Sequence, residues 1–252
     1  MAGMVTIVGA LTGCGRDGMT AVFAHRGCTQ GFVENTLDAF AEARRLGADG
    51  VELDVRLTAD GALAVHHDAE VAGRGVIGEL GVADLPPHVP LLAAALAVCE
   101  GMVVNVEIKN DPGEPGWDPG ESVAALAAAV IEDAGWSERV IVSSFQLSTL
   151  RAVQAADSRL ALGALWGLAA DPGPALAEAA AAGFRAVHPF VTAVDRALVE
   201  QAHGRGLAVN VWTVNAPDDL RAMVELGVDA VITDRLADAL AIAAGEGRRS
   251  AG

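Results

Sequence analysis

The sequence predicts an α/β fold: a closed (β/α)8 barrel of the TIM type, with a short β-hairpin inserted after the second strand. Strand-like apolar runs alternate with helical ones, and charged residues stand at the ends of three of those runs. One such barrel needs about the 252 residues present. We expect a single barrel domain at 20–246, an extension at 1–19 that is disordered or a mis-assigned start, and a C-terminal tail at 247–252.

Eight runs have the length and apolar composition of parallel strands, and each is followed by a run with helical periodicity. Glycines stand where several of these helices should end, as left-handed C-cap positions favour. The predicted strands are residues 20–26, 50–57, 102–109, 139–145, 160–166, 185–191, 207–214 and 229–233. The predicted helices are residues 36–46, 92–99, 122–134, 147–156, 175–182 and 196–204, with one more after each of the last two strands.

A ninth strand-like run, residues 62–67, is separated from the second predicted strand by the dipeptide Asp60-Gly61. This dipeptide is the signal of a two-residue type I′ hairpin turn. A hairpin partner runs antiparallel and therefore stands outside a parallel barrel. With a two-residue loop, Ala59 pairs with Ala62, and the same register places His67 opposite Asp54.

Two stretches have no clear period and read as loops or small insertions. They are residues 73–90, which contain glycine and proline, and residues 110–120, which contain three prolines and Trp117 directly after Lys109. Their position near the expected rim makes both candidates for substrate specificity.

The composition restricts partners and location. A formal net charge of −16 argues against nucleic acid as a partner. Three cysteines without metal-ligand or disulfide spacing favour a reduced, cytoplasmic setting. The alternative is an exported lipoprotein anchored through Cys14, since the apolar residues 1–15 end like a lipoprotein processing site, although they lack a basic n-region. They are too short to span a bilayer, and we expect no stable membrane insertion.

Carboxylates alternate with apolar side chains in the second and third predicted strands. Glu52 and Asp54 share one strand face, and Glu107 repeats the arrangement in the next strand. Alone, this alternation is typical of a half-exposed strand. Inside a barrel, however, buried carboxylates need a partner. Three carboxylates without cysteine are typical ligands of one hard divalent cation, Mg2+ or Ca2+, with Mn2+ as a further candidate.

Arg26 and Lys109 lie near the same predicted rim and would add positive charge suited to a phosphoryl group. The guanidinium group of Arg26 could donate hydrogen bonds to two phosphoryl oxygens at once. For Lys109, a simple salt bridge to Glu107 is an equally good interpretation.

His25 and His67 are the candidates for proton transfer, because phosphodiester cleavage needs one group deprotonated and another protonated near neutral pH. His25 and Arg26 are adjacent, so both can point inward only if the turn at Gly27 breaks the strand alternation. His66 is the weaker candidate because we expect it to face away.

From Ala21 to Leu236 the chain resembles the glycerophosphodiester phosphodiesterase family. Several motifs occur in the family's order, and together they are specific where none would be alone. The motifs are His25-Arg26-Gly27, Glu34-Asn35-Thr36-Leu37-Asp38-Ala39-Phe40, Gly50-Val51-Glu52-Leu53-Asp54-Val55, Thr58-Ala59-Asp60-Gly61, His67-Asp68, Glu107-Ile108-Lys109, Ser143-Ser144-Phe145, Val211-Trp212-Thr213-Val214-Asn215 and Ile232-Thr233-Asp234.

The resemblance implies a TIM barrel that hydrolyses small glycerophosphodiesters to glycerol 3-phosphate and an alcohol, using one divalent metal ion. It implies these roles: Glu52, Asp54 and Glu107 as metal ligands, His25 and His67 as the acid/base pair, Arg26 and Lys109 as phosphate contacts, and Phe145 and Trp212 on the glycerol side of the pocket. For the two aromatic residues, barrel-core packing is the alternative. Asn35 and Thr36 are expected to cap the first helix.

One departure concerns the segment after His67-Asp68, where the family commonly has Arg-Thr-Thr and this chain has Gly73-Arg74-Gly75. The headgroup preference is therefore open. Two alternative functions also stay open: a phospholipase D-like lyase that yields a cyclic phosphate, and a catalytically silent barrel that binds phosphodiesters.

Overall fold

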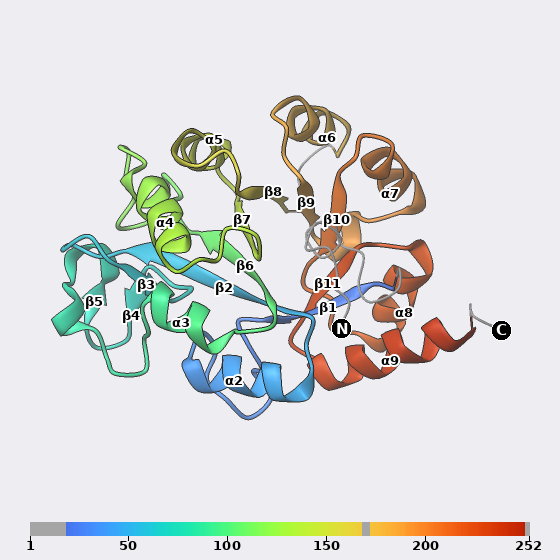
Figure 1. Cartoon of the computed structure of the whole chain (residues 1–252), viewed down its shortest axis with the longest axis horizontal. Helices are drawn as coiled ribbons and strands as arrows, with labels where there is room; N and C mark the ends of the chain where they lie inside the picture. Colours follow the sequence, from blue (N-terminus) through green and yellow to red (C-terminus); the bar gives the residue numbers. More distant parts are fainter. Residues whose placement is uncertain (1–18, 168–171, 250–252) are drawn as a thin grey trace.

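The computed structural model describes residues 19–167 and 172–249, and its centre is a closed ring of parallel strands (Figure 1). The ring order is β1-β11-β10-β9-β8-β7-β6-β2, and the pairing of β1 with β2 closes it. The ring strands are β1 (Ala21–His25), β2 (Gly50–Leu57), β6 (Val103–Ile108), β7 (Val140–Ser144), β8 (Ala161–Trp166), β9 (Ala186–Pro189), β10 (Ala208–Val211) and β11 (Ala230–Thr233). The predicted (β/α)8 barrel is confirmed.

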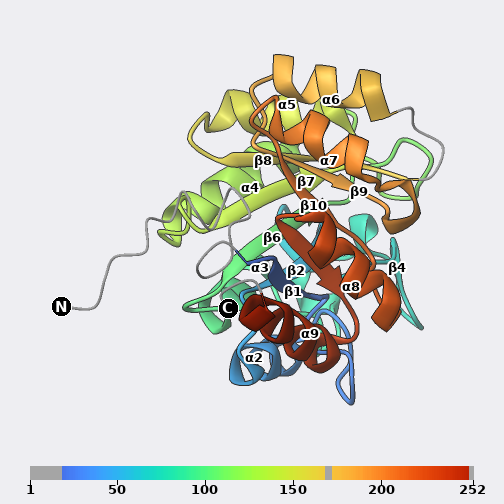
Figure 2. The same ribbon diagram turned by 90° about the vertical axis from the view of Figure 1, so that its right-hand side faces the viewer.

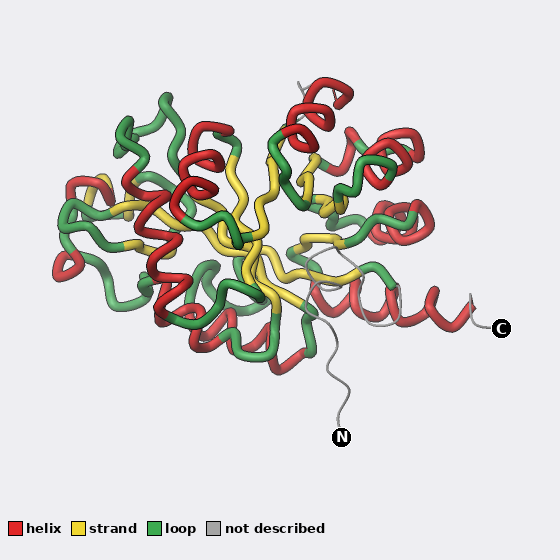
Figure 3. The backbone as a smooth tube through the Cα atoms, turned by 45° about the horizontal axis from the view of Figure 1, so that its top comes forward, coloured by secondary structure: helices red, strands yellow, loops and turns green. Residues whose placement is uncertain are grey.

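Helices form the outer layer around the strands, as the colouring in Figure 3 shows. They are α2 (Leu37–Leu46), α3 (Leu92–Val98), α4 (Ser122–Asp133), α5 (Leu147–Ala156), α6 (Pro172–Ala181), α7 (Arg196–His203), α8 (Pro217–Leu226) and α9 (Leu236–Arg249). Helices α5 and α6 lie across the strands from α2 and α9 in both perpendicular views (Figures 1 and 2). Within the described ranges, no helix combines the length and apolarity needed to cross a bilayer.

The predicted extension before residue 19, with Cys14, and the end of the predicted tail, residues 250–252, lie outside the described residues. Helix α5 and strand β2 begin and end at the residues predicted from the sequence, 147–156 and 50–57. The glycines that stand near the ends of predicted helices include Gly47, Gly135, Gly183, Gly206 and Gly227, and each of these has a positive φ, as a left-handed cap requires.

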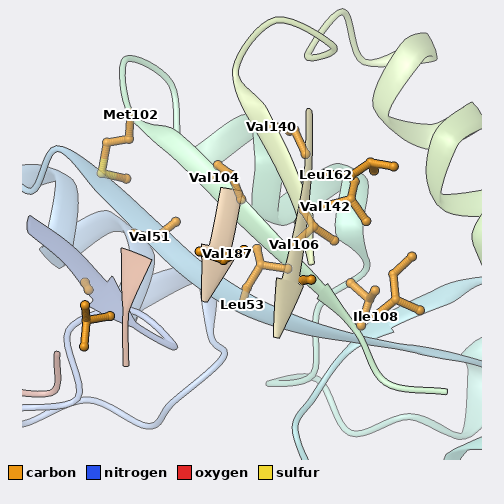
Figure 4. Close-up of a cluster of buried hydrophobic side chains, with 14 of the residues drawn as sticks. Val51, Leu53, Met102, Val104, Val106, Ile108, Val140, Val142, Leu162 and Val187 are labelled. Atoms are coloured by element: carbon orange, nitrogen blue, oxygen red, sulfur yellow. The ribbon is translucent and has the colours of Figure 1, made fainter. Parts of the chain in front are cut away.

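Every second residue of the ring strands packs outward against the helices. Val51 and Leu53 of β2 lie beside Val104 and Val106 of β6 in this layer, and all four are fully buried (Figure 4). Because these positions are apolar, the alternate positions of β2 and β6 must face the barrel interior.

The interior of the barrel is apolar at the amino ends of the strands. The ladder sets Phe23 beside Gly50 and Gly50 beside Val103. A Cβ atom at Gly50 would lie 2.8 Å from the Phe23 ring and 2.8 Å from the Val103 carbonyl oxygen, so the phenyl ring fills the space that glycine leaves. The cluster comprises Ala21, Phe23, Val103, Ile141, Ala161, Ala230 and Ile232.

Above this layer the interior becomes polar. Asn105 donates to the Ser143 hydroxyl over 3.0 Å, and the Asn210 side-chain nitrogen lies 3.2 Å from Nε2 of His188. His188 is fully buried, and burial lowers its pKa to about 3, so the ring is neutral. Its imidazole occupies the place where a Cβ atom at Gly163 would stand.

The predicted hairpin is present, but its predicted register is wrong by one residue. The extra strand β3 (Leu63–Val65) runs antiparallel to β2, with Val55 opposite Val65, and lies outside the ring. Continuing this register places His66, whose N–H donates to the Asp54 carbonyl over 3.0 Å, where His67 was expected.

The register differs because the loop has three residues, 59–61, instead of two. Thr58 pairs with Ala62: its N–H donates to the Ala62 carbonyl over 2.9 Å, and its hydroxyl accepts from the Ala62 N–H over 2.9 Å. The same hydroxyl donates to Asp60 over 2.7 Å. Gly61, with φ of 79°, takes the left-handed position that such a loop requires.

The expected insertion after the hairpin contains small regular elements. Strands β4 (Glu70–Val71) and β5 (Gly75–Val76) pair antiparallel, followed by the 3-10 turns η2 (Ile77–Glu79) and η3 (Val82–Asp84). A Cβ atom at Gly78 would lie 2.9 Å from the Gly116 Cα atom, so the insertion packs tightly against the irregular stretch 110–120.

We expect Gly50→Ala to destabilise the fold by about 1–3 kcal/mol, because the added methyl group overpacks the interior against Phe23. Gly245→Ala, in helix α9 with nothing within 4 Å of the added Cβ atom, should instead stabilise by about 0.5–1 kcal/mol. Urea unfolding of both variants measures the difference. Equal stability of the two variants would contradict this account of the interior.

Candidate active site

Three buried carboxylates of β2 and β6 meet inside the barrel. Asp54 lies opposite Glu107 in the ladder, and Glu52 is two residues earlier on the same face of β2. Each of the three offers an oxygen, and these oxygens lie within 4.8 Å of one another. Their residues are only 3%, 1% and 7% exposed, in the order Glu52, Asp54 and Glu107. The predicted convergence is therefore present in the structure.

Neighbouring groups compensate these charges unevenly. Lys109 Nζ lies 3.2 Å from Asp54 Oδ1 and also contacts Glu107, while Arg26 Nε lies 3.4 Å from Asp54 Oδ2. Burial opposes the ionisation of Asp54, but Lys109 and Arg26 outweigh it and lower the pKa of that carboxyl group. Burial, followed by the charge of Asp54, raises the pKa of Glu52 to about 8.

The residues present fit a divalent cation. Among the described residues, Glu52 Oε1 is buried without a hydrogen-bond partner, whereas its other oxygen accepts from the Arg26 N–H over 3.0 Å. Three carboxylates face one ammonium group and one guanidinium group, and the guanidinium is also bonded to Glu34 over 3.0 Å. An all-oxygen donor set with excess negative charge is the chemistry that Mg2+, Ca2+ and Mn2+ prefer.

Both candidate histidines direct Nδ1 to a carboxylate. His25 Nδ1 lies 2.7 Å from Asp234 Oδ1, and His67 Nδ1 lies 2.8 Å from Asp68 Oδ1. In each ring Nε2 is therefore the nitrogen left for a ligand, and His25 Nε2 lies 3.9 Å from Glu52 Oε2. Both rings line one pocket with Arg26 and Lys109.

The two histidines differ electrostatically. Burial opposes protonation of His25, but the hydrogen bond with Asp234 and the charge of Glu52 outweigh it and raise the pKa of the ring. For His67, burial lowers the pKa, and the neighbouring Asp54 offsets this only in part. The site thus holds two imidazoles in unlike environments.

The predicted break in strand alternation occurs where β1 ends. Arg26 has φ of 54° and Gly27 has φ of 84°, both in the left-handed region. This turn lets His25 and Arg26 reach the same pocket although they are adjacent in sequence. A Cβ atom at Gly27 would lie 2.8 Å from the Ala39 Cβ atom, so the turn also needs glycine for close packing.

Phe145 and Trp212 stand on the side of the pocket formed by β7 and β10. Their ring centroids are 5.6 Å apart in an edge-to-face arrangement, and Phe190 packs against the same indole at 5.2 Å. The indole N–H of Trp212 donates to the His188 carbonyl over 2.8 Å. Phe145 is 40% exposed, so it presents apolar surface to the pocket, whose volume is about 370 Å³.

Sequence reasoning missed several residues that hold the site together. Asp234 is hydrogen-bonded to Nδ1 of His25, and its other carboxylate oxygen accepts from the Asn215 amide over 2.7 Å. Asp234 directly follows the apolar run of the last strand, so the expectation that charged residues at strand ends meet on the barrel rim also applied to it. Thr36 caps α2 as predicted, but Asn35 does not, because its amide donates to Asp54 Oδ2 over 2.8 Å.

A barrel rim with a cluster of three carboxylates that could hold a cation, two imidazoles and two positive side chains is typical of an enzyme that acts on phosphoryl groups. The chain belongs to the glycerophosphoryl diester phosphodiesterase family, whose family model matches residues 25–238. It is accordingly a phosphodiesterase, a hydrolase that acts on glycerophosphodiesters.

Similar proteins agree with this placement. A glycerophosphodiester phosphodiesterase from Caldanaerobacter subterraneus is 32% identical over 241 residues, covering 85% of this chain and 94% of the relative. The solved structure of a glycerophosphodiester phosphodiesterase from Thermotoga maritima is 26% identical, with a TM-score of 0.71 over 86% of this chain and 95% of that one. An Oleispira antarctica phosphodiesterase, solved with the product sn-glycerol-3-phosphate, has the same fold, with 24% identity and a TM-score of 0.79 over 89% and 96% of the two chains.

We expect Mg2+ or Mn2+ to raise the melting temperature of the protein, because a cation that binds the folded state stabilises it by mass action. Glu52→Gln should lose this shift, since it removes one carboxylate from the buried cluster. Glu225→Gln, an exposed site on α8, should keep it. Thermal melts with each cation and with EDTA measure the effect. A full shift in Glu52→Gln would contradict a cation site at these carboxylates.

Proposed function

We propose that this chain hydrolyses glycerophosphodiesters to glycerol 3-phosphate and an alcohol with one divalent cation, which Glu52, Asp54 and Glu107 would hold. The observation that carries the proposal is a cluster of three buried carboxylates, one of which, Glu107, lines a pocket together with two cationic side chains and two histidines. The Oleispira antarctica relative, solved with glycerol 3-phosphate, supports a small-molecule substrate of this kind.

Each group then has a defined task. When bound, the cation would draw electron density from the phosphoryl oxygens. Arg26 and Lys109 bind the remaining phosphoryl oxygens and neutralise charge that develops on them. One histidine accepts the proton of the attacking water or glycerol 2-hydroxyl, and the other protonates the leaving oxygen.

The remaining groups orient the substrate. Asp234 and Asp68 fix the two imidazoles through Nδ1, so that Nε2 exchanges the proton in each case. Phe145 and Trp212 form the apolar wall that we assign to the glycerol carbons. In this arrangement the charged groups of the pocket bind the phosphate, and the aromatic wall contacts the apolar part of the substrate.

The first test is a turnover screen of choline, ethanolamine, glycerol and inositol glycerophosphodiesters with Mg2+, Ca2+ and Mn2+. Phosphorus NMR should show glycerol 3-phosphate as the product, because water is the final acceptor of the phosphoryl group. A cyclic phosphate as the only end product would identify a lyase. Binding of the diesters without turnover under all three cations would identify a silent binding barrel.

Glu52→Gln should abolish the cation-dependent release of glycerol 3-phosphate while the fold survives, since the change removes one charge and almost no volume. The release of glycerol 3-phosphate is measured with a coupled dehydrogenase, and circular dichroism confirms folding. Glu225→Gln serves as the matched control. Unchanged turnover in Glu52→Gln counts decisively against the assignment.

His67→Ala should be nearly inactive on the choline diester, a substrate with a poor leaving group, because proton transfer contributes roughly 100-fold or more. Asp234→Asn should lower kcat by at least about tenfold, since the amide no longer holds the His25 ring as a charged acceptor does. Asp218→Asn, at a fully exposed position on α8, is the control for the same chemical change. Wild-type kcat in either of the first two variants would refute the two-histidine assignment.

A further inference from the structure

Arg56 is a buried cation that the proposed reaction does not use. It lies on β2 in the same inward-facing series as Glu52 and Asp54, two residues further along the strand. Its side chain is only 7% exposed. A buried guanidinium group is costly unless it is paired and hydrogen-bonded, so its partners indicate its role.

Among the residues that the structure describes, the guanidinium group has two hydrogen-bond partners, and neither is a carboxylate of the acidic cluster. Nε donates to the carbonyl oxygen of His67 over 2.8 Å, and Nη2 donates to Glu114 Oε2 over 2.7 Å. The planar fork of arginine thus joins the main chain of a candidate catalytic residue to the irregular stretch 110–120. His67 and Glu114 both line the candidate active-site pocket.

His67 stands where regular support from the sheet has ended. Strand β3 ends at Val65, and the His66 N–H makes the next main-chain bond to β2, through the Asp54 carbonyl. One residue further, the His67 carbonyl is bonded to the Arg56 side chain instead of to the ladder. Through the Arg56 side chain, β2 is therefore hydrogen-bonded to the main chain one residue beyond the last bond of the hairpin.

Arg56 also lies beneath two loops that pack against each other. Ile77 and Gly78 of the insertion, together with Pro115 and Gly116 of the stretch 110–120, line a small cavity beside it. The close approach of Gly78 and Gly116 fixes these loops relative to one another. The guanidinium group connects this pair of loops to β2, the strand that carries two of the three carboxylates.

We propose that Arg56 is a positioning residue, which holds the His67 imidazole at the correct height above the acidic cluster and ties it to the loop that carries Glu114. This inference rests on the proposed function, because it assigns a task to His67. Arg56 acts through the carbonyl of His67 and does not touch the reacting atoms. Lysine keeps the charge but cannot donate in both directions from one planar fork.

Arg56→Lys should lower kcat for the choline diester by roughly 10- to 100-fold, because small misplacement of a catalytic group is costly. KM and the Mg2+ concentration for half-maximal activity should stay within about twofold, since the carboxylates keep their places. Arg56→Gln, which also removes the charge, should lower kcat at least as much. Arg221→Lys, the same change at an exposed position on α8, should have no effect.

Glu114→Gln separates the two contacts of Arg56. It weakens the bond to the loop and leaves the bond to the His67 carbonyl in place. We expect this variant to raise KM more than it lowers kcat, because Glu114 borders the pocket but does not support the imidazole. A loss of kcat equal to that of Arg56→Lys would overturn the assignment of the effect to His67.

A double-mutant cycle distinguishes positioning from general destabilisation. Arg56→Lys is combined with His67→Ala and assayed on a glycerol phosphodiester with a 4-nitrophenyl leaving group, for which residual turnover is measurable. If Arg56 acts through His67, the lysine substitution should cost less than about twofold in the alanine background. An equal loss in both backgrounds, or wild-type kcat in Arg56→Lys alone, would overturn the inference.

The failure of this inference is distinguishable from failure of the proposed function. Absence of turnover in the wild-type protein, or full activity of His67→Ala, would reject the proposed function. An inactive His67→Ala together with a fully active Arg56→Lys and Arg56→Gln would reject only the role of Arg56.

Discussion

The burial of three carboxylates within one small volume is the constraint on which the rest of the site depends. Without compensation, such a cluster would strongly favour protonation or unfolding. Lys109, Arg26 and Asn35 each direct a donor toward Asp54, and the Arg26 N–H serves Glu52. One oxygen of Glu52 is still without a partner among the described residues. The turn at Arg26 and Gly27 therefore helps to compensate the buried negative charge. It brings the Arg26 guanidinium group to Asp54 and the Arg26 main-chain N–H to Glu52.

The barrel makes this cluster possible by separating two environments within one interior. Small and aromatic apolar side chains close the amino end, where Phe23 fills the space above Gly50. The polar pairs of Asn105 with Ser143 and of His188 with Asn210 form a layer above that apolar plug. The charged groups thus stand on a polar layer in which Asn105 Oδ1, Asn210 Oδ1 and His188 Nδ1 have no hydrogen-bond partner among the described residues. The outward-facing valines and leucines anchor the same strands to the helices.

The rhythm of strand-like and helical runs sufficed to predict the barrel. Within it, the alternation of apolar and charged residues in β2 and β6 predicted the acidic cluster, because strand geometry decides which side chains share a face. The hairpin register could not be predicted from Asp60-Gly61, since the Thr58 hydroxyl closes a longer loop through contacts invisible in a dipeptide. The pairing of Asp234 with His25 spans 209 residues, and only closure of the ring brings them together. The role of Arg56 likewise depends on where two irregular loops lie, which periodicity does not encode.

The fit of the His188 imidazole into the space left by Gly163 has an evolutionary consequence. Neither position is free to change alone: any side chain at Gly163 would collide with the ring, and a small residue at His188 would leave a hole lined by polar atoms. Relatives should therefore exchange these two residues together, in pairs of nearly constant combined size. Such paired substitutions would be visible in an alignment of many homologues, even where the residues of the catalytic rim do not change.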